Sequence, residues 1–158
     1  IAFRRVQKGL VLVFVDPTDC SLPIDTVAAL ARALPNADFI INVGLGTDAT
    51  RNIKPAILNQ DSKSRVKYAA FLGGDGFFTD KEVIDMAEAG QDDRLRGKFR
   101  EYYHAAMRTL DYAHFATERV EHYYDLLFAC RHELGVTFWK RAQKYKPNNQ
   151  STFDFGAS

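Results

Sequence analysis

The sequence lacks an excess of charge of either sign, and it has no long apolar run. Its 158 residues include 21 Lys and Arg and 20 Asp and Glu, a formal net charge of +1. No global positive field therefore draws the chain to nucleic acid or to an anionic membrane, although a local basic patch stays open. No apolar run approaches the roughly 20 residues of a membrane span, and no signal segment opens the chain. We therefore expect a cytoplasmic protein without a membrane segment.

Cysteine is also scarce. Cys20 and Cys130 are the only two, too few and too widely spaced for a zinc site, an iron–sulfur site or a disulfide scaffold, so we expect reduced thiols. No two of the four histidines stand at metal-ligand spacing on one helix face. We assign no metal site.

The first part of the chain has the pattern of a β-α-β unit. The apolar run Leu10–Val15 predicts a strand covered on both faces, and it ends at Asp16-Pro17. A helix is expected from Pro23 to Leu34, because apolar residues recur there at helical spacing. Phe39–Gly44 is the next strand, and a helical crossover between them implies that the two strands are parallel.

Helices dominate the middle of the chain. Thr79, with Glu82 three residues later, predicts a capping box that opens one helix. A longer helix follows over residues 95–110, and its outer side carries several basic residues that favour a solvated face over a nucleic-acid patch. The glycines of Gly73–Gly76 lack phosphate-loop spacing and predict a turn.

The chain then returns to strands and ends on a helix. Ala113–Val120 and Tyr123–Cys130 predict two strands, and the short join between them makes them antiparallel neighbours. Glu133 stands near the start of the last helix. We expect that helix to bury a face made of Leu134, Phe138, Trp139, Ala142 and Tyr145.

Three groups of residues resemble the three-Cys-motif partner protein family. They are Val13–Pro17, then Phe39–Asn42 with Thr50–Asn52 downstream, and finally Tyr123–His132 with Phe138–Lys140; the Gln150–Phe155 tail is similar too. The resemblance runs from Gly9 onward and lies in the order and spacing of the motifs. It implies a methyltransferase-like protein of bacterial cytoplasm, with an iron–sulfur, radical-type protein that carries the three-cysteine motif as its partner.

The resemblance also implies a fold. It is an α/β fold with a partial Rossmann-like, class I methyltransferase-like sheet, in which parallel strands are followed by an antiparallel strand pair, with extra helices in the middle. The glycine-rich turn and the later acidic residue that bind S-adenosylmethionine in this fold are not in the sequence. We therefore expect residues 1–158 to be one methyltransferase-like domain whose N-terminal, cofactor-binding half precedes Ile1.

The resemblance places the candidate site at the end of the first strand. In the wider fold an Asp/Asn-Pro-Pro-aromatic motif orients an amino nitrogen for methylation, so Asp16 and Pro17 are the candidate catalytic residues. Thr18 and Asp19 replace the second proline and the aromatic residue, which counts against a nucleobase as the substrate. They are candidate substrate-binding residues. The alternative for Asp16-Pro17 is a turn that ends the strand.

Two further candidates lie beyond the second strand, at the edge where open α/β sheets bind ligands. Arg51 and Asn52 are candidate substrate-binding residues, because an arginine there can grip a phosphate or a carboxylate. The alternative is a solvated loop.

Two functions stay open from the sequence. The first is an S-adenosylmethionine-dependent methyltransferase with an unknown target. The second is a non-catalytic partner module that keeps the fold and binds a neighbouring iron–sulfur protein. A homo-oligomer is also open, because the outer edge of the Leu10–Val15 strand would be an exposed apolar edge that must associate or be covered.

Overall fold

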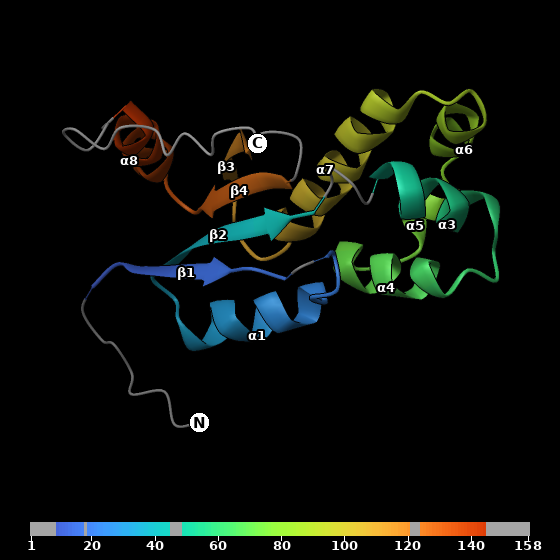
Figure 1. The fold of residues 1–158 in the computed structure, drawn as a ribbon. Coiled ribbons are helices and arrows are strands. Elements are labelled where there is room, and N and C mark those ends of the chain that lie inside the picture. Colours follow the sequence, from blue (N-terminus) through green and yellow to red (C-terminus); the bar gives the residue numbers. More distant parts are fainter. Residues whose placement is uncertain (1–8, 18, 45–48, 121–123, 145–158) are drawn as a thin grey trace, which may run out of the picture.

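A computed structural model describes residues 9–17, 19–44, 49–120 and 124–144 as a four-stranded sheet with helices on both of its faces (Figure 1). The elements, in chain order, are β1 (Val11–Val15), α1 (Ile24–Ala33), β2 (Ala37–Val43), η1 (Ala49–Ile53), α3 (Lys54–Leu58), α4 (Lys63–Leu72), α5 (Gly76–Thr79), α6 (Lys81–Glu88), α7 (Asp92–Arg108), β3 (His114–Val120), β4 (Tyr124–Cys130) and α8 (Glu133–Lys144). None of the described helices is both long enough and apolar enough to cross a membrane.

The strand order of the described sheet is β1-β2-β4-β3. β1 and β2 are parallel, as the β-α-β pattern predicted, with Val13 opposite Phe39. β4 is antiparallel to both of its neighbours and lies between β2 and β3, so the prediction of an antiparallel strand pair is confirmed. The mixed α/β class is therefore correct, and β1 is an edge strand of the described sheet.

One face of the sheet packs on α1 and α7 and forms the core. Phe39 and Ile41 of β2 point into this core, where they join Val27 of α1 and Met107 of α7. Tyr112, just after α7, closes the core: its hydroxyl donates a hydrogen bond to the Ala37 carbonyl at 2.9 Å. Burial raises the pKa of Tyr112 to about 12, so this hydroxyl keeps its proton at neutral pH.

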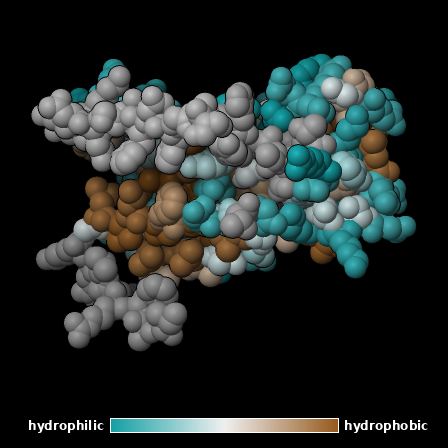
Figure 2. Space-filling model, in the orientation of Figure 1, coloured by the Kyte–Doolittle hydropathy of each residue, from teal (hydrophilic) through white to brown (hydrophobic). Residues whose placement is uncertain are grey.

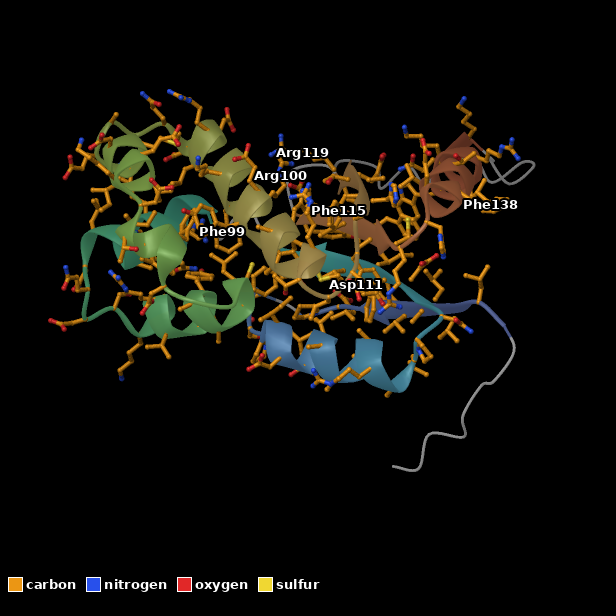
Figure 3. The ribbon with its side chains drawn as sticks, turned by 180° about the vertical axis from the view of Figure 1, so that it is seen from behind. Phe99, Arg100, Asp111, Phe115, Arg119 and Phe138 are labelled. Carbon is orange, nitrogen blue, oxygen red and sulfur yellow. The ribbon has the colours of Figure 1, made fainter. Side chains whose placement is uncertain are left out.

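A second part of the core is aromatic and lies beside the sheet, among α4, α5 and α7. Phe71 stacks on Tyr103 with ring centroids 4.2 Å apart, and Phe77 meets Phe99 edge to face at 5.3 Å. Figure 3 shows Phe99 within this helical region, away from the strands. Phe99 and Tyr103 of the long helix α7 are therefore core residues.

Two local predictions fall in the helical region, the helix cap at Thr79 and the glycine-rich turn at Gly73–Gly76. The capping box at Thr79 was wrong: Asp80 caps α6, since its carboxylate accepts a hydrogen bond from the Glu82 backbone N–H at 2.9 Å. Thr79 is the last residue of α5 instead, and its hydroxyl donates to the Gly76 carbonyl. The glycine-rich turn is confirmed, because Gly73 ends α4 in the left-handed conformation (φ 83°) that favours glycine.

The predicted buried face of the last helix was also wrong. None of the residues of α8 is buried, and Leu134 and Phe138 are 67% and 59% exposed. Ala142 is exposed too, while Tyr145 lies outside the described residues. The helix covers β3 and β4 through Trp139, whose ring stacks on Phe128 with centroids 5.0 Å apart, and the rest of its apolar face turns away from the sheet.

Candidate functional site

The candidate site begins where the parallel strands β1 and β2 end. Val15 is in register with Ile41, so the next residues, Asp16 and Asn42, are cross-strand neighbours. The Asn42 Nδ2 group donates a hydrogen bond of 2.6 Å to Asp16 Oδ1. The two strand ends therefore carry one joined polar pair, at the edge where open α/β sheets bind their ligands.

Asp16 is available to a ligand. Its side chain is exposed, and the Asn42 amide occupies only one of its two carboxylate oxygens. A carboxylate accepts hydrogen bonds on both oxygens, so the second oxygen can accept from an N–H of a bound molecule. The side-chain amide oxygen of Asn42, Oδ1, is buried and has no hydrogen-bond partner among the described residues, which leaves it a further unsatisfied acceptor beside the carboxylate.

Side-chain alternation puts an apolar group next to this pair. Asp16 lies on the same face of the sheet as Phe14, two residues earlier in β1. Phe14 is 60% exposed. The pair thus combines an anionic acceptor with an accessible aromatic ring, on the face of the sheet that α1 does not cover.

Asp19, the other candidate substrate-binding residue of this segment, is partly exposed and already has a partner. It forms an ion pair with Lys67 of α4, with 2.9 Å between Lys67 Nζ and Asp19 Oδ2. A hydrogen bond with Ser21, and then the bond from Lys67, lower the pKa of Asp19 below its usual value. Asp19 therefore ties α4 to the turn before α1. Thr18 lies outside the described residues.

Arg51 and Asn52 lie on η1, the segment that the structure describes next after β2. Arg51 is exposed and forms no ion pair with another described residue, whereas Asn52 is partly buried and has a partner. An exposed guanidinium fits the prediction of an anion-binding residue and fits a solvated loop equally well. The contacts within the described chain do not join Arg51 to the Asp16–Asn42 pair.

Asn42 was not predicted as a site residue from the sequence. Its polar side chain follows the apolar residues of β2, but only the register of β1 against β2 brings it level with Asp16. Apart from this pair, on the face of the sheet that α7 covers, Asp125 at the start of β4 is a 3% exposed carboxylate. Arg100 Nη1 lies 3.0 Å and Arg119 Nε 3.6 Å from its oxygens (Figure 3 labels both arginines).

The basic side of α7 is largely neutralised. Arg96 pairs with Asp93, Lys98 with Glu82, and Arg100 with Asp125. The remaining two cations make other contacts: Arg94 donates to Gln91, and Arg108 lies over the Phe115 ring. These contacts favour the solvated-face interpretation of the basic residues over a nucleic-acid patch.

The described residues contain no cluster of three His, Cys, Asp or Glu side chains able to hold a metal ion. Cys20 and Cys130 are both buried, free thiols. Burial raises the pKa of the Cys130 thiol, which keeps it protonated and unreactive at neutral pH.

Comparisons of the chain with protein-family models, with curated proteins and with solved structures found no match. The resemblance to the three-Cys-motif partner family therefore stays a prediction. The candidate site rests on the geometry of Asp16 and Asn42.

Proposed function

We propose that this chain is the acceptor-binding part of an S-adenosylmethionine-dependent, methyltransferase-like protein of the three-Cys-motif partner type. The observation that carries the proposal is the hydrogen bond between Asn42 and Asp16, which fixes an exposed carboxylate at the carboxyl ends of two parallel strands. A carboxylate held there is suited to receive an amino nitrogen.

The order of the strands supports the same proposal. Two parallel strands followed by an antiparallel pair are the usual second half of the Rossmann-like methyltransferase fold, and this chain has β1 and β2 parallel with β4 and β3 antiparallel beyond them. Asp16-Pro17 then stands at the place of the acceptor-orienting motif. The fold is shared by proteins of many functions, so the site carries more weight than the topology.

The residues that the structure describes do not form the usual site for S-adenosylmethionine, the cofactor that the proposal implies and the source of the methyl group. Its usual glycine-rich turn follows a strand, whereas the described glycine-rich segment, Gly73–Gly76, follows α4 and leads into α5. β1 leads instead into Asp16-Pro17. We therefore assign no described residue to the cofactor, and derive only what the chain does to the acceptor.

The acceptor chemistry follows from the oxygens at the strand end. With Asp16 Oδ1 held by Asn42, the other carboxylate oxygen accepts a hydrogen bond from the target amine. The Pro17 carbonyl is the second acceptor that the motif predicts. Two fixed acceptors orient the nitrogen and direct its lone pair, and positioning of this kind supplies much of the catalysis in a transfer reaction.

A titration followed by NMR tests this proposal on the 158-residue chain. The probes are three small molecules with an amino nitrogen: adenosine, N-acetyl-lysine amide and N-acetyl-glutamine amide. We expect at least one to shift the Asn42 side-chain signals saturably, and Asp16→Ala to abolish that shift. The matched control is Asp25→Ala, an exposed carboxylate in the first turn of α1. No saturable shift, or a shift that survives Asp16→Ala, would contradict the proposal.

A non-catalytic partner module is the second candidate function, and one observation favours it. Leu12 and Phe14 leave a bare apolar surface on β1, and an apolar surface of this kind is typical of protein interaction sites. In that case a neighbouring iron–sulfur protein in the cytoplasm is the partner that the family resemblance predicts. If none of the three amine probes binds in the titration although the chain is folded, the result favours this second candidate.

A further inference from the structure

A group of large apolar side chains lies uncovered on the face of the sheet opposite α1. We call it the open face, and it consists of Leu10, Leu12, Phe14, Leu134 and Phe138, each between 59% and 82% exposed. Figure 2 shows apolar residues gathered over this side of the molecule, where β1 and β2 lie in Figure 1.

The open face has two unequal parts. β1 supplies a floor, because Leu12 and Phe14 project from the face of the strand opposite to Val11, Val13 and Val15, which pack against the core. α8 supplies an exposed ridge that carries Leu134 and Phe138. In Figure 3, Phe138 lies on α8 at the far end of the molecule from Phe99.

The two parts of the open face are complementary, because β1 has no helix over it and the apolar side of α8 packs on no strand. The β1 floor is a strand surface without a helix over it, whereas helices pack on the opposite surface of the same strand. α8 is a helix with an apolar side that buries nothing, since it covers β3 and β4 through Trp139 instead. Within one copy, Leu134 and Phe138 stay exposed, so α8 does not cover its own β1 floor.

We propose that the open face packs against the open face of a second copy of this chain about a two-fold axis, with α8 of each copy over the β1 floor of the other. A two-fold arrangement requires one surface to be complementary to itself. The open face meets this requirement because it holds both the uncovered strand and the uncovered helix. This inference shares Phe14 with the surroundings of the Asp16–Asn42 pair, but it rests on neither Asp16 nor Asn42 and is tested without any ligand.

The size and charge of the open face agree with this occupant. A fully buried aromatic side chain covers roughly 150–250 Å², so five large side chains at these exposures offer on the order of 500 Å² per copy. A stable interface takes about 800 Å² per partner, with the remainder in a polar rim. None of the five residues is charged, and the net charge of +1 puts little repulsion between copies.

Sedimentation equilibrium of the 158-residue chain over a range of concentrations is the first test. We expect a monomer–dimer equilibrium, and a dissociation constant raised at least tenfold by Phe14→Lys on the floor and equally by Phe138→Glu on the ridge. The matched control is Val66→Lys, because Val66 is 74% exposed on α4 and lies outside the open face. Circular dichroism checks that each variant is folded.

A mixing experiment tests the reciprocal contact itself. The Phe14→Lys chain keeps an intact ridge, and the Phe138→Glu chain keeps an intact floor. Their mixed dimer therefore has one native contact and one in which lysine faces glutamate. We expect native mass spectrometry to show mixed dimers where each variant alone is monomeric.

Three results would overturn the proposal. A wild-type chain that stays monomeric at all concentrations shows that another polypeptide, or nothing, occupies the open face. A dimer weakened by Phe14→Lys but unaffected by Phe138→Glu places the contact at the free edge of β1 rather than on α8. A dimer that Val66→Lys weakens as much as the open-face variants places it elsewhere.

Discussion

The two faces of the sheet are built from alternate residues of the same strands, yet they differ in how they are covered. Phe39 and Ile41 of β2 are fully buried against α1 and α7. Leu12 and Phe14 of the adjacent β1, on the other face, are each 60% exposed. The sequence is apolar on both faces of β1, but the described chain supplies a helix over only one of them. An apolar pattern therefore shows that a surface needs a cover, and does not show which molecule supplies it.

The largest test of this comparison replaces one phenylalanine on each face. Phe39→Ala removes a fully buried ring that meets Tyr112 edge to face, with centroids 5.2 Å apart, so we expect the free energy of unfolding to fall by about 3–5 kcal/mol. Phe14→Ala removes an exposed ring, and we expect a loss below about 1 kcal/mol for the monomer. Urea unfolding of both variants at low protein concentration measures the difference.

The outcome separates the two faces directly. Equal losses for the two variants at low concentration would mean that the open face is covered within one copy, contrary to the exposure of Phe14. A loss for Phe14→Ala that grows with protein concentration, while that for Phe39→Ala stays constant, agrees with cover by a second copy.

Much of the fold was predictable because its signals are local. The apolar runs of β1 and β2, with a helix between them, predict a parallel pair, and the short join before β4 predicts an antiparallel one. The face of α8 was not predictable in this way. The spacing of its apolar residues indicates that one side of the helix should be buried. Only the stacking of Trp139 on Phe128 shows which side packs on the sheet.

The candidate site was predictable in part for a related reason. Asp16 follows from a strand end next to a proline, which a local motif reveals. Its partner Asn42 lies 26 residues away in sequence, and only the register of β1 against β2 brings them level. The ion pair of Asp19 with Lys67 was not predictable from the sequence, because it depends on how α4 packs.

A smaller loss of stability is expected at the buried carboxylate of the covered face, by which we mean the face of the sheet that packs on α1 and α7. Asp125 is 3% exposed and meets both Arg100 and Arg119. Asp125→Asn keeps the shape but removes the charge, so we expect a loss of about 2 kcal/mol, because both arginines are partly exposed and regain water. Asp85→Asn is the control, since its pair with Lys81 is exposed to water and contributes little to stability. Thermal unfolding at pH 7 compares them, and equal losses would contradict a special role for burial.

The smallest effect is a pH dependence that belongs to the covered face alone. His104 of α7 stacks on Phe115 with ring centroids 4.2 Å apart, and its Nε2 is buried with no partner among the described residues. Burial, and then the positive charges of Arg108 and Arg100, lower the pKa of His104 to about 4.

Below about pH 6.5 the unfolded chain binds a proton at His104, whereas the folded chain binds it only near pH 4. The free energy of unfolding therefore falls as the pH falls through this window. Because the ring is partly exposed and screened, we expect His104 to account for about 1 kcal/mol of that fall. His104→Phe keeps the stacking without the proton, so its urea unfolding should lose about 1 kcal/mol less than the wild-type chain between pH 7 and pH 4.5. An identical loss in both chains would show that the site is open to water, and that the covered face is less closed than its buried rings indicate.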